Sequence, residues 1–82
     1  MAAGTSKRYG TIATAQAVGL TLRQLYYWVR VLRVVHPSTQ QHGRRRFQYF
    51  SVRDVKRLRA MKQWLARGYT LRAAARRATR RS

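Results

Sequence analysis

The sequence contains no cysteine, and Asp54 is the single acidic residue among its 82 residues. The absence of cysteine excludes disulfides and thiolate metal sites. One carboxylate cannot form a catalytic carboxylate pair. The two histidines, His36 and His42, have no acid to orient them and no third protein ligand with which to hold a metal. The sequence therefore predicts that the chain is not an enzyme and that it binds no cofactor or metal.

Long apolar runs are also absent. No stretch approaches the roughly 18 consecutive apolar residues that a membrane-spanning helix needs. The N-terminus lacks the apolar core of about 7–15 residues that a secretory signal carries. The sequence thus predicts neither a membrane span nor export, and we expect a cytoplasmic, nucleoid-associated protein.

Basic residues dominate the charge. Nineteen lysines and arginines stand against one acid, which gives a formal net charge of +18. Self-repulsion at this charge opposes a compact fold unless a polyanion relieves it. Hydrophobic residues make up 45% of the chain, which is enough for the core of one small domain. The composition favours a nucleic acid as partner, because clustered cations release counterions from phosphates. An anionic membrane surface is the rival partner.

The region from residue 20 to residue 32 has the pattern of an amphipathic helix. Thr21 suits the N-cap, because its hydroxyl can accept a hydrogen bond from an amide of the first turn. An apolar stripe recurs at helical spacing and consists of Leu22, Leu25, Val29 and Leu32. The opposite face carries no acid and has side chains suited to base edges and phosphates, namely Arg23, Gln24, Tyr27 and Arg30.

A shorter helix is predicted before it, over residues 12–18 with Thr11 as the N-cap. Gly19 suits the left-handed position that ends such a helix. The residues expected to face the core are Ile12, Ala15 and Val18. Two helices joined by a tight turn form the helix-turn-helix unit, in which the second helix reads DNA.

The next region is predicted to form a two-stranded hairpin. Its strands are expected at Val34–Thr39 and Arg45–Tyr49, with a loop around His42 and Gly43. A lone hairpin is marginal in water, so this one must lean on the helices. Its basic tip would project as a wing and consists of Arg44, Arg45 and Arg46.

Two further helices complete the prediction. Ser51 and Asp54 form a capping box at the start of the longer one, which should end at Gly68. Thr70 is the expected N-cap of the last helix, over Leu71–Ala78. The expected inward residues are Val55, Leu58, Met61 and Leu65 in the longer helix and Leu71, Ala74, Ala75 and Ala78 in the last one.

The predicted domain covers residues 9–79, between a flexible basic arm at residues 1–8 and a frayed tail at residues 80–82. Trp28 and Trp64 could stack on single-stranded bases, but at helical spacing they are expected to belong to the core.

Four motifs occur in order along the chain: LTLRQLYYW at 20–28, GRRR with YFS between 43 and 51, SVRDVKRL at 51–58 and GYTL at 68–71. Together they resemble the winged helix-turn-helix DNA-binding domain of the MerR family, over about residues 9–78. The resemblance is to stand-alone members, BldC-like or excisionase-like, because the chain stops where the family normally continues into a dimerisation helix and an effector domain.

The resemblance implies a recognition helix in the major groove, a wing on the flanking backbone and bending of the duplex. Base readout is carried over to Arg23, Gln24 and Tyr27. Contacts to the DNA backbone are expected from Thr21, Tyr26, Arg30, Arg44, Arg45, Arg46 and Arg53. Tyr26 stands where the family usually has arginine.

The predicted fold is therefore mainly α with a small β-hairpin wing, a winged helix-turn-helix with four helices. The predicted function is sequence-specific binding of double-stranded DNA by a transcriptional regulator without an effector domain. The alternatives are an excisionase-type architectural factor of a phage or plasmid, an RNA-binding basic domain, a membrane-active cationic peptide or protein-interaction module, or a fragment of a larger regulator. We expect a monomer in solution that associates cooperatively on DNA repeats.

Overall fold

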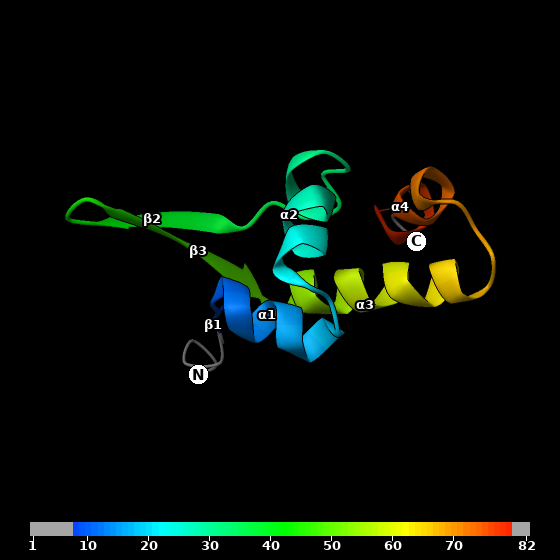
Figure 1. Ribbon diagram of the computed structural model, residues 1–82, viewed down its shortest axis with the longest axis horizontal. Helices are drawn as coiled ribbons and strands as arrows, with labels where there is room; N and C mark the ends of the chain where they lie inside the picture. The colour runs from blue at the N-terminus through cyan, green and yellow to red at the C-terminus, as the bar shows by residue number, and fades with distance from the viewer. Residues whose placement is uncertain (1–7, 80–82) are drawn as a thin grey trace, which may run out of the picture.

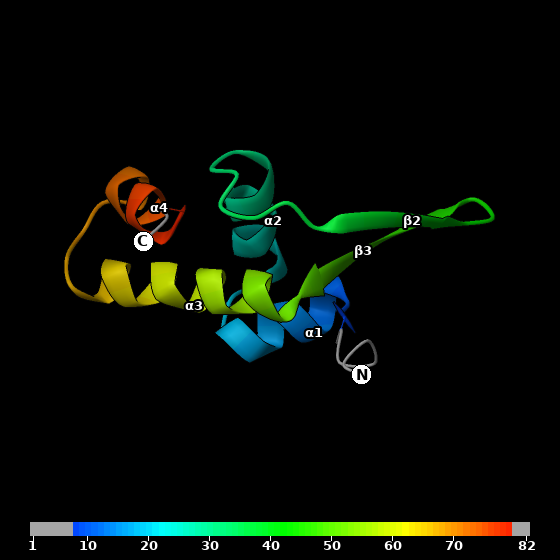
Figure 2. The same ribbon diagram turned by 180° about the vertical axis from the view of Figure 1, so that it is seen from behind.

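The computed structural model describes residues 8–79, which form four helices and three strands. Their order is β1 (Arg8–Tyr9), α1 (Thr11–Val18), α2 (Leu22–Arg30), β2 (Ser38–His42), β3 (Arg45–Ser51), α3 (Val52–Ala66) and α4 (Leu71–Thr79). Helix α3 runs through the middle, with α1 on one side of it and α2 and α4 on the other (Figures 1 and 2). The predicted fold class, mainly helical with a small antiparallel sheet, is confirmed.

Helix α1 ends as predicted but begins one residue earlier than predicted, with Gly10 and not Thr11 as its N-cap, and it turns a different face to the core. Gly19 follows it in the left-handed conformation, with φ of 85°. Ile12, expected inside, is 63% exposed, whereas Thr14 is fully buried beside Ala15. The buried stripe is centred between residues 14 and 18, and Ile12 lies about 110° around the helix from that centre. The predicted inward position of Ile12 is therefore wrong.

Helix α2 begins with a complete capping box. The Thr21 hydroxyl accepts from the amide of Gln24 at 3.1 Å, and the Gln24 side-chain oxygen accepts from the amide of Thr21 at 3.0 Å. The helix buries Leu25 and Trp28, as predicted for both, and these two define its inner stripe. Leu22, the first member of the predicted stripe, lies about 90° from that centre and is 41% exposed, so its inward placement is wrong.

The chain leaves α2 through a wide turn. The amides of Val31 and Leu32 both donate to the carbonyl of Tyr27, and Arg33 adopts a positive φ of 52°. Val34 and Val35 follow, and both are buried in the core instead of starting a strand. Successive side chains of a strand point to opposite faces, so two adjacent buried valines fit a core segment better than the edge of a wing. The first wing strand thus starts at Ser38, four residues later than predicted.

The sheet has the order β1-β3-β2, and both pairings are antiparallel. The β2–β3 hairpin is the predicted wing and projects away from the helices (Figure 1). Strand β1 is an addition that the sequence did not predict, because two residues carry no periodicity. Arg8, assigned to the flexible arm, pairs with Ser51 at the base of the wing. The rest of the predicted arm, residues 1–7, and the predicted tail, residues 80–82, lie outside the described residues.

Helices α3 and α4 begin at the predicted caps. The Ser51 hydroxyl accepts from the amide of Asp54 at 3.1 Å, and the Asp54 carboxylate accepts from the amide of Ser51 at 2.9 Å. Gly68 ends the α3 region with φ of 99°, and the Thr70 hydroxyl accepts from the amide of Ala73. Leu71, expected inside, is 40% exposed, because it lies in the first turn of α4 at the rim of a surface hollow.

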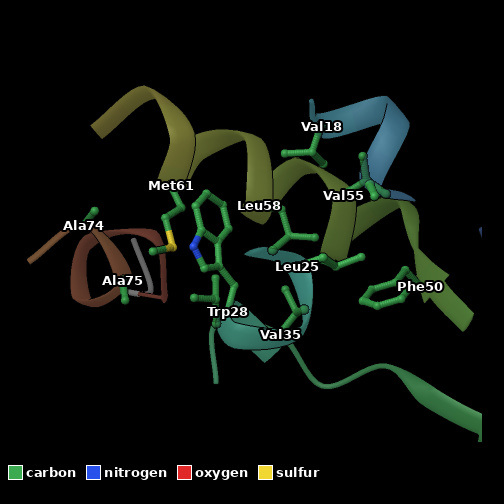
Figure 3. Close-up of a cluster of buried hydrophobic side chains, with 12 residues drawn as sticks. Val18, Leu25, Trp28, Val35, Phe50, Val55, Leu58, Met61, Ala74 and Ala75 are labelled. Atoms are coloured by element: carbon green, nitrogen blue, oxygen red, sulfur yellow. The ribbon is translucent and has the colours of Figure 1, made fainter. Parts of the chain in front are cut away.

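The core lies between α3 and the other elements (Figure 3). Trp28 is buried there as predicted, whereas Trp64 is half-buried at the periphery, where its ring meets Tyr69 edge-on at 5.2 Å. The buried core consists of Ala15, Val18, Leu25, Trp28, Val34, Val35, Phe50, Val55, Leu58, Met61, Ala74 and Ala75. This packing holds α2 between the wing and α4, with its polar face outward.

Candidate nucleic-acid interface

The outward face of α2 carries the predicted base-reading side chains. Arg23, Gln24 and Tyr27 are all exposed. The Gln24 oxygen already accepts a hydrogen bond in the capping box, which holds the side chain in this rotamer and uses one of the two lone pairs of the oxygen. Arg23 takes no part in the capping box and lies in the first turn of the helix. The structure therefore separates two residues that look equivalent in the sequence.

A first hollow lies between α2 and the wing, with a volume of about 200 Å³. Tyr26 and Arg30 reach it from α2, and Arg46 reaches it from β3. The Arg30 guanidinium carbon lies 5.7 Å from the centre of the Tyr26 ring, a cation–π distance that orients both side chains. Thr39 and Gln48, which pair across the two wing strands, complete the lining. Every polar side chain of this hollow can donate a hydrogen bond, which suits a phosphate.

Two more hollows continue from the first. The second, about 350 Å³, shares Arg30 and Gln48 with the first and adds Arg33 and His36. The third, about 600 Å³, shares Arg33 and His36 with the second and reaches α4. It adds three more arginines, Arg57 from α3 and Arg72 and Arg76 from α4. We refer to the three adjoining hollows as the cationic track, which runs from the wing past the end of α2 to α4.

The remaining predicted contact residues lie outside the track. Thr21 and the wing-tip residues Arg44 and Arg45 are exposed and line none of the three hollows. Arg45 precedes Arg46 on β3 and so points to the opposite face of the wing. Arg53 is exposed one helical turn before Arg57 on α3, but it does not line the track either. The structure thus brings together Tyr26, Arg30 and Arg46 and leaves the others apart.

Several track residues were missed by sequence reasoning. Period-two alternation would have placed Gln48 beside Arg46, and four-residue spacing would have placed Arg72 beside Arg76. Arg33 carried no usable signal, since it follows the helix and precedes the misassigned valines. The missed set is Arg33, His36, Thr39, Gln48, Arg57, Arg72 and Arg76.

Other cations of the chain contact the protein itself. Arg59 donates from Nη2 to the carbonyl of Ala17 at 3.2 Å, and Lys62 donates to the carbonyl of Gly19 at 3.0 Å. These carbonyls lie at the C-terminal end of α1, where the helix dipole favours a positive charge. Both side chains therefore complete the end of α1, a helix that lies on the opposite side of α3 from α2 and α4 (Figure 1).

No three histidine or acidic side chains gather into a metal-binding group within residues 8–79. None of the four described helices is long and apolar enough to cross a membrane.

A comparison with protein families matches residues 12–80 to the MerR HTH family regulatory protein model. A comparison with curated proteins found no match. The family match covers most of the chain and includes α1, α2, the wing, α3 and α4. The chain therefore belongs to the MerR helix-turn-helix family of regulatory proteins, which are DNA-binding transcriptional regulators.

Proposed function

We propose that this protein binds double-stranded DNA sequence-specifically, with α2 in the major groove and the wing on the flanking backbone. The observation that carries the proposal is the position of α2. Its polar face points outward, and the cationic track flanks it from the wing to α4. An α-helix fits the major groove, and arginines beside it can hold the backbone on both flanks.

Base readout is assigned to Arg23, Gln24 and Tyr27. Arg23 can form the bidentate contact with guanine O6 and N7, which is the commonest specific contact to DNA. Gln24 can form a bidentate contact with adenine only if its oxygen leaves the capping box, so we expect it to contribute less. Tyr27 is 45% exposed and lines the third hollow, so we assign it a contact between the bases and the backbone.

The backbone contacts are assigned to three sets of side chains. Tyr26, Arg30 and Arg46 converge on one phosphate-sized hollow. The Thr21 hydroxyl accepts from an amide, and its own proton can be donated to a phosphate. The remaining contacts are assigned to the outlying arginines Arg44, Arg45 and Arg53. Contacts at both the wing and α4 would draw the duplex around α2, which supports bending.

Selection of sites from random duplex DNA, followed by fluorescence anisotropy on the selected site, tests the proposal. If about six phosphates are neutralised, the plot of log affinity against log salt should have a slope near −5. Arg23→Ala should cost on the order of 1–3 kcal/mol and relax specificity at one position. The matched control is Lys56→Gln, an exposed charge on α3 that does not line the track.

Three results would contradict the proposal: no enriched site, a flat salt response, or an Arg23→Ala loss equal to that of Lys56→Gln. Tighter binding to a structured RNA in direct competition would favour the RNA-binding alternative, because RNA is recognised through shape and 2′-hydroxyls. An enriched site that is bent without any effect on transcription would favour the excisionase-type alternative.

A further inference from the structure

Arg33 has an unusual backbone conformation. Its φ of 52° lies in the left-handed region, where an L-residue with a side chain is strained. The other left-handed positions among residues 8–79 are Gly19, Gly43 and Gly68. Glycine takes this conformation without steric cost. Of these four left-handed positions, Arg33 is therefore the one at which the chain has a long cationic side chain in place of glycine.

The surroundings of Arg33 indicate why an arginine stands at this left-handed position. The amide of Val34 donates to the carbonyl of Trp28 at 3.1 Å, and both residues are buried, so the core holds the turn in place. Arg33 itself is exposed. Its side chain lines both the second and the third hollow, and it shares that position only with His36. The strained residue is thus the junction of the cationic track.

We propose that Arg33 is a DNA-backbone-binding residue whose guanidinium joins the two halves of the track, at the expense of folding stability. This inference rests on the proposed function, because it takes a DNA phosphate as the ligand of the track. Arginine suits this junction since its planar fork can donate toward both hollows at once. Backbone strain that persists at a surface site is a mark of function when the surrounding structure enforces it.

Replacement of Arg33 by glycine should change folding stability and DNA affinity in opposite directions. Arg33→Gly should raise the thermal unfolding midpoint by about 4 °C, because glycine relieves the strain in a domain of this size. The same variant should bind a mixed-sequence 30-base-pair duplex about three- to tenfold more weakly. Loss of one phosphate contact should also make the log–log salt slope shallower by about 0.9. A residue with only a structural role would not change that slope.

Two further variants complete the experiment. Arg33→Lys keeps the charge and should therefore retain the slope, but it loses the planar fork and should recover only part of the affinity. Lys56→Gln removes one positive charge away from the track and should change affinity by less than twofold. Wild-type protein that binds neither this duplex nor a duplex with the selected site would refute the proposed function itself. Wild-type binding with an Arg33→Gly variant of unchanged affinity, or with a loss matched by Lys56→Gln, would refute the role of Arg33 alone. An Arg33→Gly variant with no gain in stability would refute the claim of strain.

Discussion

The two sides of α3 carry the same charge and use it differently. On one side Arg59 and Lys62 donate to the last carbonyls of α1, which has no basic residue in its own final turn. On the other side Arg57 lines the cationic track with Arg72 and Arg76. One set of cations stabilises the fold, and the other surrounds open space. A net charge of +18 therefore predicts a polyanion partner but does not locate its binding surface.

The largest effect is expected on the α1 side of α3, from a substitution at Gly19 that lowers the free energy of unfolding. Gly19→Ala forces an L-residue into φ of 85° and places its Cβ 2.7 Å from the Lys62 amino group. We expect a loss of about 2 kcal/mol in the free energy of unfolding, from left-handed strain and from the displaced lysine. Urea unfolding measures it. Gly68→Ala is the matched control, because its φ is 99° but no atom of the described part of the chain lies within 4 Å of the added Cβ. Equal losses in the two variants would show that Lys62 contributes nothing.

On the track side the expected effect is on binding and not on stability. Arg46→Ala should weaken DNA binding by about 1 kcal/mol, or about fivefold, for every sequence alike. Arg45→Ala should weaken it less, because Arg45 points to the other face of the wing and lines no hollow of the track. Anisotropy on the selected duplex and on a scrambled duplex checks both variants. A larger loss for Arg45 would place the duplex on the opposite face of the wing.

Removal of the buried hydroxyl of Thr14 in α1 should increase folding stability. Among residues 8–79 its Oγ1 has no hydrogen-bond partner, although the residue is fully buried. Thr14→Val should therefore raise the free energy of unfolding by about 1 kcal/mol while leaving DNA affinity unchanged. The urea midpoint at constant slope is the measurement. A lower midpoint would mean that the hydroxyl has a partner in solution.

The smallest effect is expected from the α1-capping lysine. Lys62→Met removes one exposed charge and one bond to the carbonyl of Gly19, which should cost about 0.5 kcal/mol of stability. DNA affinity should fall no more than it does in Lys56→Gln. If Lys62→Met instead reduced affinity as strongly as Arg46→Ala, the two sides of α3 would share one role.

The sequence was sufficient for the caps at Thr21, Ser51 and Thr70 and for the glycine that ends α1, because these depend on local chemistry. The predicted cap at Thr11 is the exception, since Gly10 is the N-cap of α1 and makes no side-chain cap bond. The capping boxes of Thr21 with Gln24 and of Ser51 with Asp54 pair the first amides of their helices with side chains three residues away. Gly19 ends α1 through its own left-handed conformation. Such interactions depend little on the tertiary fold.

The errors lie where tertiary packing decides. Val34 and Val35 have strand-forming side chains, but burial of both placed them in the core. Thr14 is buried where Ile12 was expected, because the short helix α1 packs on α3 with a different face inward. The candidate site divides in the same way. The helical face of α2 could be predicted from period 3.6, whereas Arg33, Arg72 and Arg76 meet it only through the fold.

The dimensions of the molecule bear on how copies could share one duplex. It measures 41 × 33 × 19 Å, and the wing and α4 lie at opposite ends of the longest axis (Figure 1). At about 3.4 Å per base pair, 41 Å corresponds to a footprint of about 12 base pairs, slightly more than one helical turn. With this axis along the duplex, neighbours on tandem sites about 12 base pairs apart would abut, each wing meeting the α4 end of the next copy. Repeat spacing would thereby set their cooperativity.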